Sequence, residues 1–279
     1  MSESGKLYIV ATPIGNLEDL SSRAVRVLNE VDFIAAEDTR VTAKILNHIG
    51  VKKSLISCQK YNETERSEQI VSRILKGENA AFCSDAGTPV ISDPGGALVS
   101  KALDNKVTVV PVPGPSAVVT ALSVCGLRCE RFCFEGFLPT PKGKRKERLE
   151  ELQNEKRTLV FYEAPHKLQR TLHDLLSYFG NRKITICREL TKLHEEIWRT
   201  DIEEASTYYD VNSPRGEYVL VIEGTKEEKS LEMSLEDAAD IARKYMEEGY
   251  SASDAAKKAA KETGFTKSDI YKAAREVID

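Results

Sequence analysis

The sequence predicts an α/β protein that consists of two α/β domains and a small C-terminal helical domain. Short apolar runs alternate with helical patterns in the first half of the chain, and the same alternation resumes in a second block. The last segment is rich in Ala, Lys, Asp and Glu and has no strand pattern. We therefore expect domains at residues 1–127, 128–226 and 234–279.

The first block contains five short apolar runs with the length of buried strands. They are KLYIVA (6–11), VDFIAA (31–36), SLISC (54–58), NAAFC (79–83) and VTVVPV (107–112). Between them, apolar residues recur at helical spacing over 24–31, behind the candidate caps Ser21 and Ser22, and over 70–75, before Gly77. Strands that alternate with helices indicate a mainly parallel sheet with helices on both faces.

The second block and the C-terminal segment continue the pattern. Strands are expected at RTLVFY (157–162), KITICR (183–188), EIWRT (196–200) and EYVLVIEG (217–224), with a helix over 167–179. The charged segment 225–233 has the composition of a linker. Within residues 251–279, two helical patterns flank Thr263-Gly264-Phe265, which is the arrangement of a helix-turn-helix unit.

Composition excludes several classes of protein. An apolar content of 41% and a charged content of 30% describe an ordinary globular protein, and a net charge of −4 excludes one coated in basic residues. Neither a signal peptide nor a membrane-length apolar run is visible, so we expect a cytoplasmic protein. The six cysteines form no C-x-x-C pair, and CGLRCERFC (125–133) does not have iron–sulfur spacing, so we expect reduced thiols and no metal.

Three glycine-rich loops follow strands of the first block. They are ATPIGN (11–16), SDAGTPVISDPGG (84–96) and PVPGPSA (111–117). Ligands of open parallel sheets bind beyond the carboxyl ends of the strands, and Gly15, Gly87 and Gly114 allow the main chain to approach a bound molecule. Each loop alone is better explained as a tight turn between a strand and a helix. Three loops at one edge of one sheet favour a nucleotide-like cofactor.

The chain carries neither of the usual phosphate-binding signatures. No G-x-G-x-x-G follows the first strand, and G-x-x-x-x-G-K-[ST] is absent. A cofactor without a phosphate chain, such as S-adenosylmethionine, would explain such loops.

Several of these segments together resemble a known family. TPIGNLEDL (12–20), AEDTR (36–40), SDAGTPVISDPG (84–95) and VPGPSA (112–117) are similar to motifs of the tetrapyrrole methylase superfamily of S-adenosylmethionine-dependent enzymes. FEGFLP (134–139), YEAPHK (162–167), RELTKLHEE (188–196) and RGEYVLVIEG (215–224) extend the likeness to its branch that methylates ribosomal RNA. The resemblance covers nearly all of residues 6–224, and it departs at Lys167, where arginine is more usual.

The resemblance implies a fold, an activity and a cofactor site. The fold would be two α/β domains of the tetrapyrrole methylase type with the cofactor cleft between them, usually in a homodimer. The activity would be methylation of the ribose 2′-hydroxyl of one cytidine in the decoding region of 16S rRNA, either free or in the assembled small subunit. Carried over by motif, the contacts to S-adenosylmethionine would come from Pro13, Ile14, Gly15, Asp85, Ala86, Gly87, Thr88, Pro89, Ser116, Ala117, Tyr162, Glu163, Ala164, Glu217 and Leu220.

A ribose hydroxyl is a poor nucleophile, so a base or a cation near it should assist the transfer. We expect this role of Asp38, Arg40, Glu163 and Lys192, while Glu189 and His166 are further suppliers. The alternatives are structural: Asp38 and Arg40 would form a buried pair that anchors their loop, and His166 would cap the helix after it.

Two regions are candidates for RNA contact. The segment PKGKRKERL (141–149) is predicted to be a basic loop that leads into a helix, and such clusters bind phosphates. Its candidate contacts, together with those of the YEAPHK motif, are Lys142, Lys144, Arg145, Lys146, Arg148, His166 and Lys167. A solvated face is the alternative for the segment, and docking on the ribosome or on a partner subunit is the alternative for the nearly neutral tail.

Two other functions are compatible with parts of the sequence. One is a C-methyltransferase that acts on a tetrapyrrole, and the other is a DNA-binding regulator that uses the tail to bind DNA. The basic segment favours a ribosomal substrate over a tetrapyrrole, and the weak charge of the tail disfavours the regulator.

Overall fold

The computed structural model describes residues 4–225 and 234–275. It divides the chain into a body, which ends at Thr225, and a C-terminal unit. No helix in the described ranges is long and apolar enough to cross a membrane.

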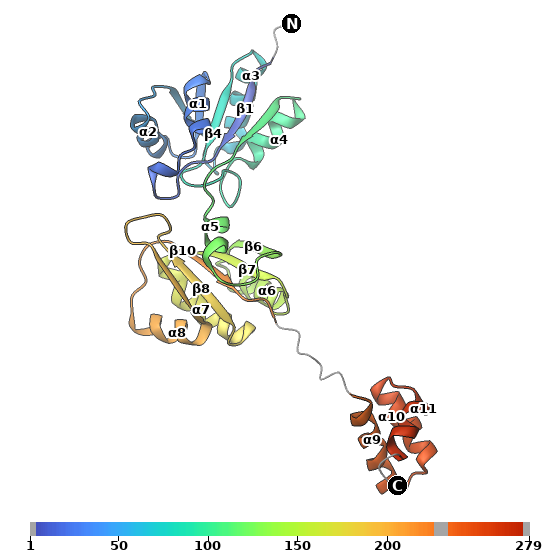
Figure 1. Ribbon diagram of the computed structural model, residues 1–279. Helices are drawn as coiled ribbons and strands as arrows, with labels where there is room; N and C mark the ends of the chain where they lie inside the picture. The colour runs from blue at the N-terminus through green and yellow to red at the C-terminus, as the bar shows by residue number, and fades with distance from the viewer. Residues whose placement is uncertain (1–3, 226–233, 276–279) are drawn as a thin grey trace. The chain divides into compact units, whose positions relative to one another are not determined.

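Five parallel strands form the first sheet of the body, in the order β3-β2-β4-β1-β5 (Figure 1). They are β1 (Lys6–Val10), β2 (Phe33–Ala36), β3 (Ser54–Ser57), β4 (Ala80–Cys83) and β5 (Thr108–Val112). Each strand lies inside one of the five predicted apolar runs, and the predicted parallel sheet is confirmed.

Four helices cover this sheet, two on each face. They are α1 (Ser22–Glu30), α2 (Thr39–His48), α3 (Glu63–Leu75) and α4 (Gly96–Asp104), and the short 3₁₀ helix η1 (Leu17–Asp19) precedes α1. Successive strand residues point to opposite faces, so Phe33 packs with α3 and α4 while Ile34 packs with α1 and α2. The predicted cap Ser21 accepts a hydrogen bond from the Ala24 amide at the start of α1.

The second sheet has the order β6-β7-β10-β8-β9. Its strands are β6 (Phe132–Phe137), β7 (Thr158–Glu163), β8 (Lys183–Arg188), β9 (Glu196–Asp201) and β10 (Tyr218–Ile222). Only β6 and β7 are parallel neighbours, and the remaining pairs are antiparallel. The four strands predicted for this block are confirmed, whereas β6 was not predicted because the FEGF sequence lacks a regular apolar alternation.

Helices cover both faces of this second sheet. They are α5 (Ala117–Val124) on one face and α6 (Lys142–Leu152), α7 (Pro165–Phe179) and α8 (Ile202–Val211) on the other. The basic segment is therefore helical from Lys142 onwards, rather than a loop that leads into a helix. The division at residue 127 stays a prediction, and α5, which it assigns to the first block, packs against the second sheet.

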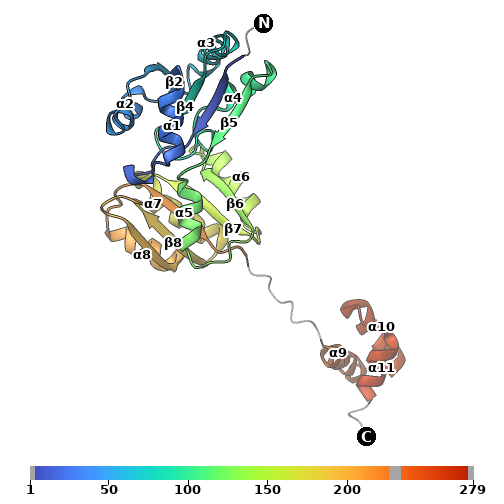
Figure 2. The same cartoon turned by 45° about the horizontal axis from the view of Figure 1, so that its top comes forward.

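The two sheets meet at the loops that follow the parallel strands. In both Figure 1 and Figure 2, β1 runs from the N-terminus toward the second sheet. Because the first sheet is parallel, the carboxyl ends of its strands and the three glycine-rich loops face the second sheet. This places a candidate ligand site between the two halves of the body.

The C-terminal unit is a bundle of three helices, α9 (Leu235–Glu247), α10 (Ala252–Thr263) and α11 (Lys267–Arg275). Its core consists of small side chains together with Ile270. Gly264 adopts the left-handed conformation, with φ of 78°, and separates α10 from α11, as predicted for a helix-turn-helix unit. Most of the predicted linker, and the last residues of the predicted tail, lie outside the described residues.

We expect a chain that ends at Thr225 to keep the fold of the body, because none of the body's described core clusters includes a residue of the C-terminal unit. Its thermal unfolding midpoint should lie within about 2 °C of the corresponding transition in the full chain. Differential scanning calorimetry measures both. A fall of about 10 °C or more would contradict the separation of the two units.

Candidate functional site

The three glycine-rich loops form one continuous surface. Thr12 and Gly87 exchange two main-chain hydrogen bonds of 2.8 and 3.0 Å, and the Thr88 hydroxyl donates to the carbonyl of Pro115 at 3.1 Å. Gly87 has φ of +76°, a region that residues with a side chain rarely adopt. A Cβ atom on Gly114 would lie 3.0 Å from the Cβ of Ala11, so the chain packs closely there as well.

A cavity of about 470 Å³ lies between this surface and the second sheet. That volume is within the usual range of small-molecule sites, roughly 300–1,000 Å³. Ile14, Leu190 and Val219 give the cavity apolar walls, and Asp93 and Lys192 place charged side chains in it. Predicted cofactor residues that line it are Ile14, Ala86, Gly87, Thr88, Ser116, Ala117, Tyr162, Glu163, Ala164 and Glu217.

The other predicted cofactor residues do not line the cavity. Pro13 and Pro89 are buried in the loops themselves. The carboxylate of Asp85 accepts a hydrogen bond from the Asp38 amide at 2.9 Å, so it joins two loops. Leu220 is fully buried in the core on the α7 side of β10, so within the expected segment 217–220 it is Val219, and not the side chain of Leu220, that faces the cavity.

Gly15 stands where the two halves of the body touch. A Cβ atom on Gly15 would lie 2.4 Å from Cγ of Lys192, 2.9 Å from Oγ1 of Thr191 and 3.1 Å from the carbonyl oxygen of Leu190. No other residue fits in that space without displacing the turn after β8. Gly15 therefore acts through this contact rather than as part of the cavity wall.

Lys192, which we expected to be catalytic, is held in the cavity wall by two carboxylates. Its Nζ atom lies 2.9 Å from Oε1 of Glu189 and 2.7 Å from Oε2 of Glu217. Partial burial disfavours the charged form of Lys192, but its hydrogen bonds to Glu217 and Glu189 outweigh this effect and raise its pKa. Lys192 is therefore a fixed cation at neutral pH and cannot act as a base.

The turn that carries this lysine is strained. Glu189 and Thr191 have φ of 51° and 66°, a region that costs a non-glycine residue about 1–2 kcal/mol. A Cβ atom on Gly216 would lie 2.6 Å from Cγ of Glu189, so the glycine makes room for this carboxylate. The Glu217 amide donates to Glu189 at 2.9 Å, which links the RELTK and RGEY motifs directly.

Sequence reasoning missed several cavity residues. They are Ile91, Asp93, Phe137, Pro165, Cys187 and Leu190, while Tyr218 and Val219 lie in the strand segment 217–220 from which contacts were expected. Asp93 stands in a loop that was already singled out, so its signal was present. Partial burial raises its pKa, a hydrogen bond with Ser84 opposes the rise, and the charge of Asp85 adds to it. Ile91 stands in the same loop and Pro165 in the YEAPHK motif, whereas the places of Phe137 and Cys187 follow only from the pairing of β6 with β7 and of β8 with β10.

Asp38 and Arg40 are not brought into the cavity. Asp38 caps α2, and its carboxylate accepts from the Arg40 amide at 2.8 Å and from the Arg40 side chain at 2.5 Å. The guanidinium of Arg40 holds the pKa of Asp38 down at about 2. Because the Arg40 side chain is 87% exposed, the expected buried pair is corrected to a surface pair that anchors the loop.

Glu163 borders the cavity, but its carboxylate is used elsewhere. Only 3% of the residue is exposed, and the two oxygens accept from the Thr171 hydroxyl at 2.5 Å and from the Ala164 amide at 2.8 Å. Thr171 in turn accepts from Arg145, whose Nε donates to Asp174 at 2.6 Å. The carboxylate of Glu163 thus ties β7 to α7 and α6, in place of the catalytic role expected for it.

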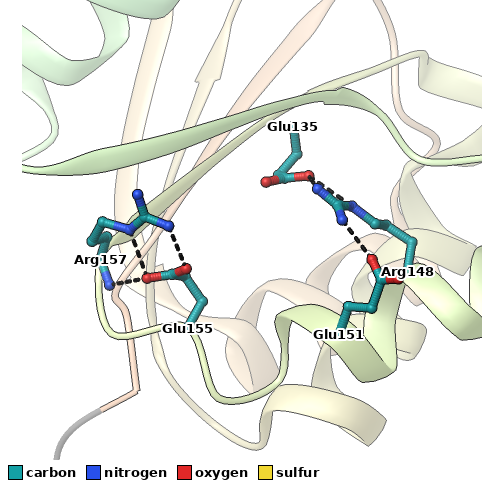
Figure 3. Close-up of polar contacts among 5 residues, drawn as sticks. All are labelled: Glu135, Arg148, Glu151, Glu155 and Arg157. Atoms are coloured by element: carbon teal, nitrogen blue, oxygen red, sulfur yellow. Dashed lines mark hydrogen bonds and ion pairs between the residues drawn. The ribbon is translucent and has the colours of Figure 1, made fainter.

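The basic residues of α6 divide into two groups. Lys142, Lys144 and Lys146 are exposed and suited to phosphate contact. Arg145 is only 4% exposed, and its hydrogen bonds lie within the core, so its predicted RNA contact is wrong. Arg148 pairs with Glu135 of β6 and with Glu151 (Figure 3), which leaves it neutralised.

The remaining predicted RNA contacts lie beside the cavity at the start of α7. His166 lines the cavity and is exposed. Ala164, not His166, occupies the N-cap position of α7. Lys167 donates to Thr140 at 3.3 Å, which draws the β6–α6 loop toward this end of the helix. In the described residues, no group of three or more His, Cys, Asp or Glu side chains is arranged to hold a metal ion, and all six cysteines are free.

The family model of the Tetrapyrrole (Corrin/Porphyrin) Methylases matches residues 6–206. The chain belongs to the tetrapyrrole methylase family. Its curated relatives include proteins named ribosomal RNA small subunit methyltransferase I. The one from Synechocystis sp. is 43% identical over 98% of both chains, and the one from Halalkalibacterium halodurans is 44% identical over 96% of this chain and 94% of its own.

A third relative of that name is shorter than this chain. The protein from Thermotoga maritima is 46% identical over 79% of this chain and 99% of its own length. It therefore has no counterpart for about a fifth of this tetrapyrrole methylase. The aligned 79% of this chain corresponds to nearly the whole length of that relative.

Solved structures show the same methylase fold. The methyltransferase CobJ superposes with a TM-score of 0.62 at 17% identity, over 80% of this chain and 95% of its own. A uroporphyrin-III C-methyltransferase from Thermus thermophilus, complexed with S-adenyl homocysteine, gives 0.57 at 19% identity, over 78% and 97%. At these identities the likeness shows the fold alone.

Arg145 and its neighbour Lys144 form a matched pair for a test of the buried network in this methylase. Arg145→Met should lower the free energy of unfolding by about 2–4 kcal/mol, because Thr171 and Asp174 lose a charged partner in a largely buried site. Lys144→Met should change it by less than about 0.5 kcal/mol, since this side chain is exposed. Urea denaturation compares the two, and equal stabilities would contradict the structural role of Arg145.

Proposed function

We propose that this protein transfers a methyl group from S-adenosylmethionine to the ribose 2′-hydroxyl of one cytidine in the decoding region of 16S rRNA. The names of relatives that share more than 40% of its residues support ribosomal RNA of the small subunit as the substrate. The cytidine, its position and the 2′-oxygen rest on the motif resemblance. The proposal includes a homodimer and, because the substrate would be small-subunit rRNA, a cytoplasmic location.

The negative charge of the cavity lining is the main observation that supports S-adenosylmethionine as the cofactor. Asp93, Glu189 and Glu217 present carboxylates there, and Lys192, the only Lys or Arg among the described lining residues, is already paired with two of them. A phosphate chain would be repelled by this set. A cofactor with a sulfonium and an ammonium group fits it, and the apolar side chains of Ile14, Leu190 and Val219 fit an adenine ring.

When bound, S-adenosylmethionine supplies a methyl group activated by the sulfonium. The chain's own task is to hold the 2′-oxygen in line with the carbon–sulfur bond, an alignment worth roughly 7–11 kcal/mol in favourable cases. Transfer forms the carbon–oxygen bond and breaks the bond between the methyl carbon and sulfur, and the hydroxyl proton passes to solvent. Negative charge develops on the 2′-oxygen as that proton leaves ahead of bond formation. We assign the stabilisation of that charge to Lys192 at the cavity wall, which would exchange one of its contacts to Glu189 or Glu217 for the oxygen.

The RNA is expected to approach over the α6 and α7 side of the cavity. His166 lines the cavity, and Lys167 beside it donates to Thr140 in the loop before α6, whose lysines at 142, 144 and 146 are exposed. Such cations bind phosphates in a salt-dependent manner, without reading sequence. Whether the substrate is free rRNA or the assembled subunit is decided by the assay below.

Asp93→Asn should weaken the binding of S-adenosylmethionine about tenfold, because a charged hydrogen-bond or ion-pair partner of the cation is lost. Calorimetric titration measures this, with Asp104→Asn, an exposed acid on α4, as the control. A cation favours the ionised carboxylate. Since the pKa of Asp93 is raised, affinity should fall as the pH decreases through that pKa, and the variant should lack this part of the fall. Equal affinities of wild type and variant would refute the contact.

The reaction itself is tested by methyl transfer to small ribosomal subunits, and to free 16S rRNA, that lack the modification. Labelled S-adenosylmethionine is supplied, and the RNA is digested to nucleosides. We expect label in 2′-O-methylcytidine. Label on a base, or on another ribose, would correct the position. Binding of the cofactor without any label in RNA would point to a small-molecule acceptor instead.

A further inference from the structure

Phe137 owes its position to an irregularity of strand β6. Phe134 and Phe137 are three residues apart, so a regular strand would place them on opposite faces. The pairing with β7 shifts between Phe134 and Gly136, which makes Glu135 an extra residue in a β-bulge. Both phenylalanine rings consequently contact Tyr162, with centroids 4.9 and 5.6 Å away.

Glu135, the extra residue, is fixed from the other face of the sheet. Its side chain is 8% exposed and accepts from Nε of Arg148 at 2.9 Å (Figure 3). Arg148 is held in turn by Glu151 at 2.5 Å. Gly136 completes the bulge with φ of +62°, and a Cβ atom there would lie 3.0 Å from the hydroxyl oxygen of Ser92 in the 84–96 loop. The bulge is thus held from both sides.

The bulge brings a large aromatic ring to the cavity and leaves it in water. Phe137 lines the cavity although 53% of the residue is exposed. Its neighbours in sequence lead to Thr140, which binds Lys167, and to the exposed Lys142. An exposed aromatic ring beside a strip of cations is the combination by which proteins bind unpaired nucleotides, with bases stacked on the ring and phosphates on the cations.

We propose that Phe137 is the surface on which the base of the target nucleotide stacks, and that Arg148 is a positioning residue that aims this ring through Glu135. This inference rests on the proposed function, since the base belongs to the RNA whose ribose is methylated. Exposure favours the RNA over the cofactor as the partner of the ring. The apolar walls at Ile14 and Val219 are buried or half-buried, whereas Phe137 is open to an incoming macromolecule.

The stacking role is tested with methyl transfer to small subunits and with calorimetric titration of S-adenosylhomocysteine. Phe137→Ala and Phe137→Leu should lower kcat/KM for the subunits roughly 5- to 100-fold, the usual range for loss of one stacked base. Phe137→Tyr, which keeps the ring, should stay within about threefold of wild type. Affinity for S-adenosylhomocysteine should not change. The control is Phe132→Ala, which removes a ring that is 40% exposed on the same strand and does not line the cavity.

The outcomes of this test distinguish a failure of the stacking role of Phe137 from a failure of the proposed function. Unchanged kcat/KM in Phe137→Ala overturns the inference and leaves the proposed function intact. Lost affinity for S-adenosylhomocysteine assigns the ring to the cofactor and also overturns it. If the wild-type protein puts no label into RNA, the proposed function fails, and the inference fails with it.

The positioning role of Arg148 is separated from phosphate contact by salt dependence. Arg148→Gln should lower kcat/KM to the same extent as Phe137→Ala. The double variant Phe137→Ala/Arg148→Gln should lose no more activity than either single variant. In Arg148→Gln, the slope of log(kcat/KM) against log[salt] should equal that of wild type. Lys144→Gln on the same helix serves as the comparison for a phosphate contact, which should reduce that slope by about one. A reduced slope in Arg148→Gln, or additive losses in the double variant, would refute the positioning role.

Discussion

The close approach of Gly15 to the turn at 190–192 is the constraint on which the cavity depends. The loop after β1 can lie against the turn after β8 only because position 15 has no side chain. This contact holds the edge of the parallel sheet beside one face of the largely antiparallel sheet, and the cavity of about 470 Å³ lies between them. Hydrogen bonds of Thr12 with Gly87 hold the 84–96 loop against the loop after β1, and the bond of Thr88 with Pro115 holds the 111–117 loop against the 84–96 loop.

The same turn also sets the charge of the site. Two non-glycine residues in the left-handed region raise the free energy of this turn, and such strain persists only where surrounding contacts impose it. Here the imposing contacts are the ion pairs of Lys192 with Glu189 and Glu217 and the space left by Gly216. A lysine paired with two carboxylates leaves the cavity with an excess of negative charge. The mechanical contact between the halves and the electrostatic preference for a cation therefore have one origin.

The strands of the first sheet were predictable because each lies in a short apolar run, and the runs of β2 and β4 are buried on both faces. The positions of the glycine-rich loops were predictable as well, because each loop directly follows one of those strands in the sequence. The site on the second sheet was less accessible to sequence reasoning. Which face a strand residue occupies depends on register, so Leu220 was expected in the cavity although it packs in the core, and Phe137 was not expected there although the bulge turns it toward the cavity. Glu163 ends a strand as predicted, but the direction of its carboxylate is set by Thr171, eight residues later.

In the basic segment, lysines and arginines have different surroundings although they carry the same charge. KGKRKER contains three lysines and two arginines, and its composition alone makes all five candidates for phosphate contact. In the structure the lysines are exposed, whereas both arginines make paired hydrogen bonds to carboxylates or a hydroxyl on neighbouring elements. This division follows from chemistry, since a guanidinium is weakly hydrated and has a planar set of donors, while an ammonium is strongly hydrated and is favoured in water. Arg145 and Arg148 are also three residues apart, which puts them on the same side of α6 as Leu149 and Leu152, facing the sheet. The helix thus directs its lysines outward and its arginines inward, so the surface proposed to bind RNA and the network of paired arginines are two faces of one element.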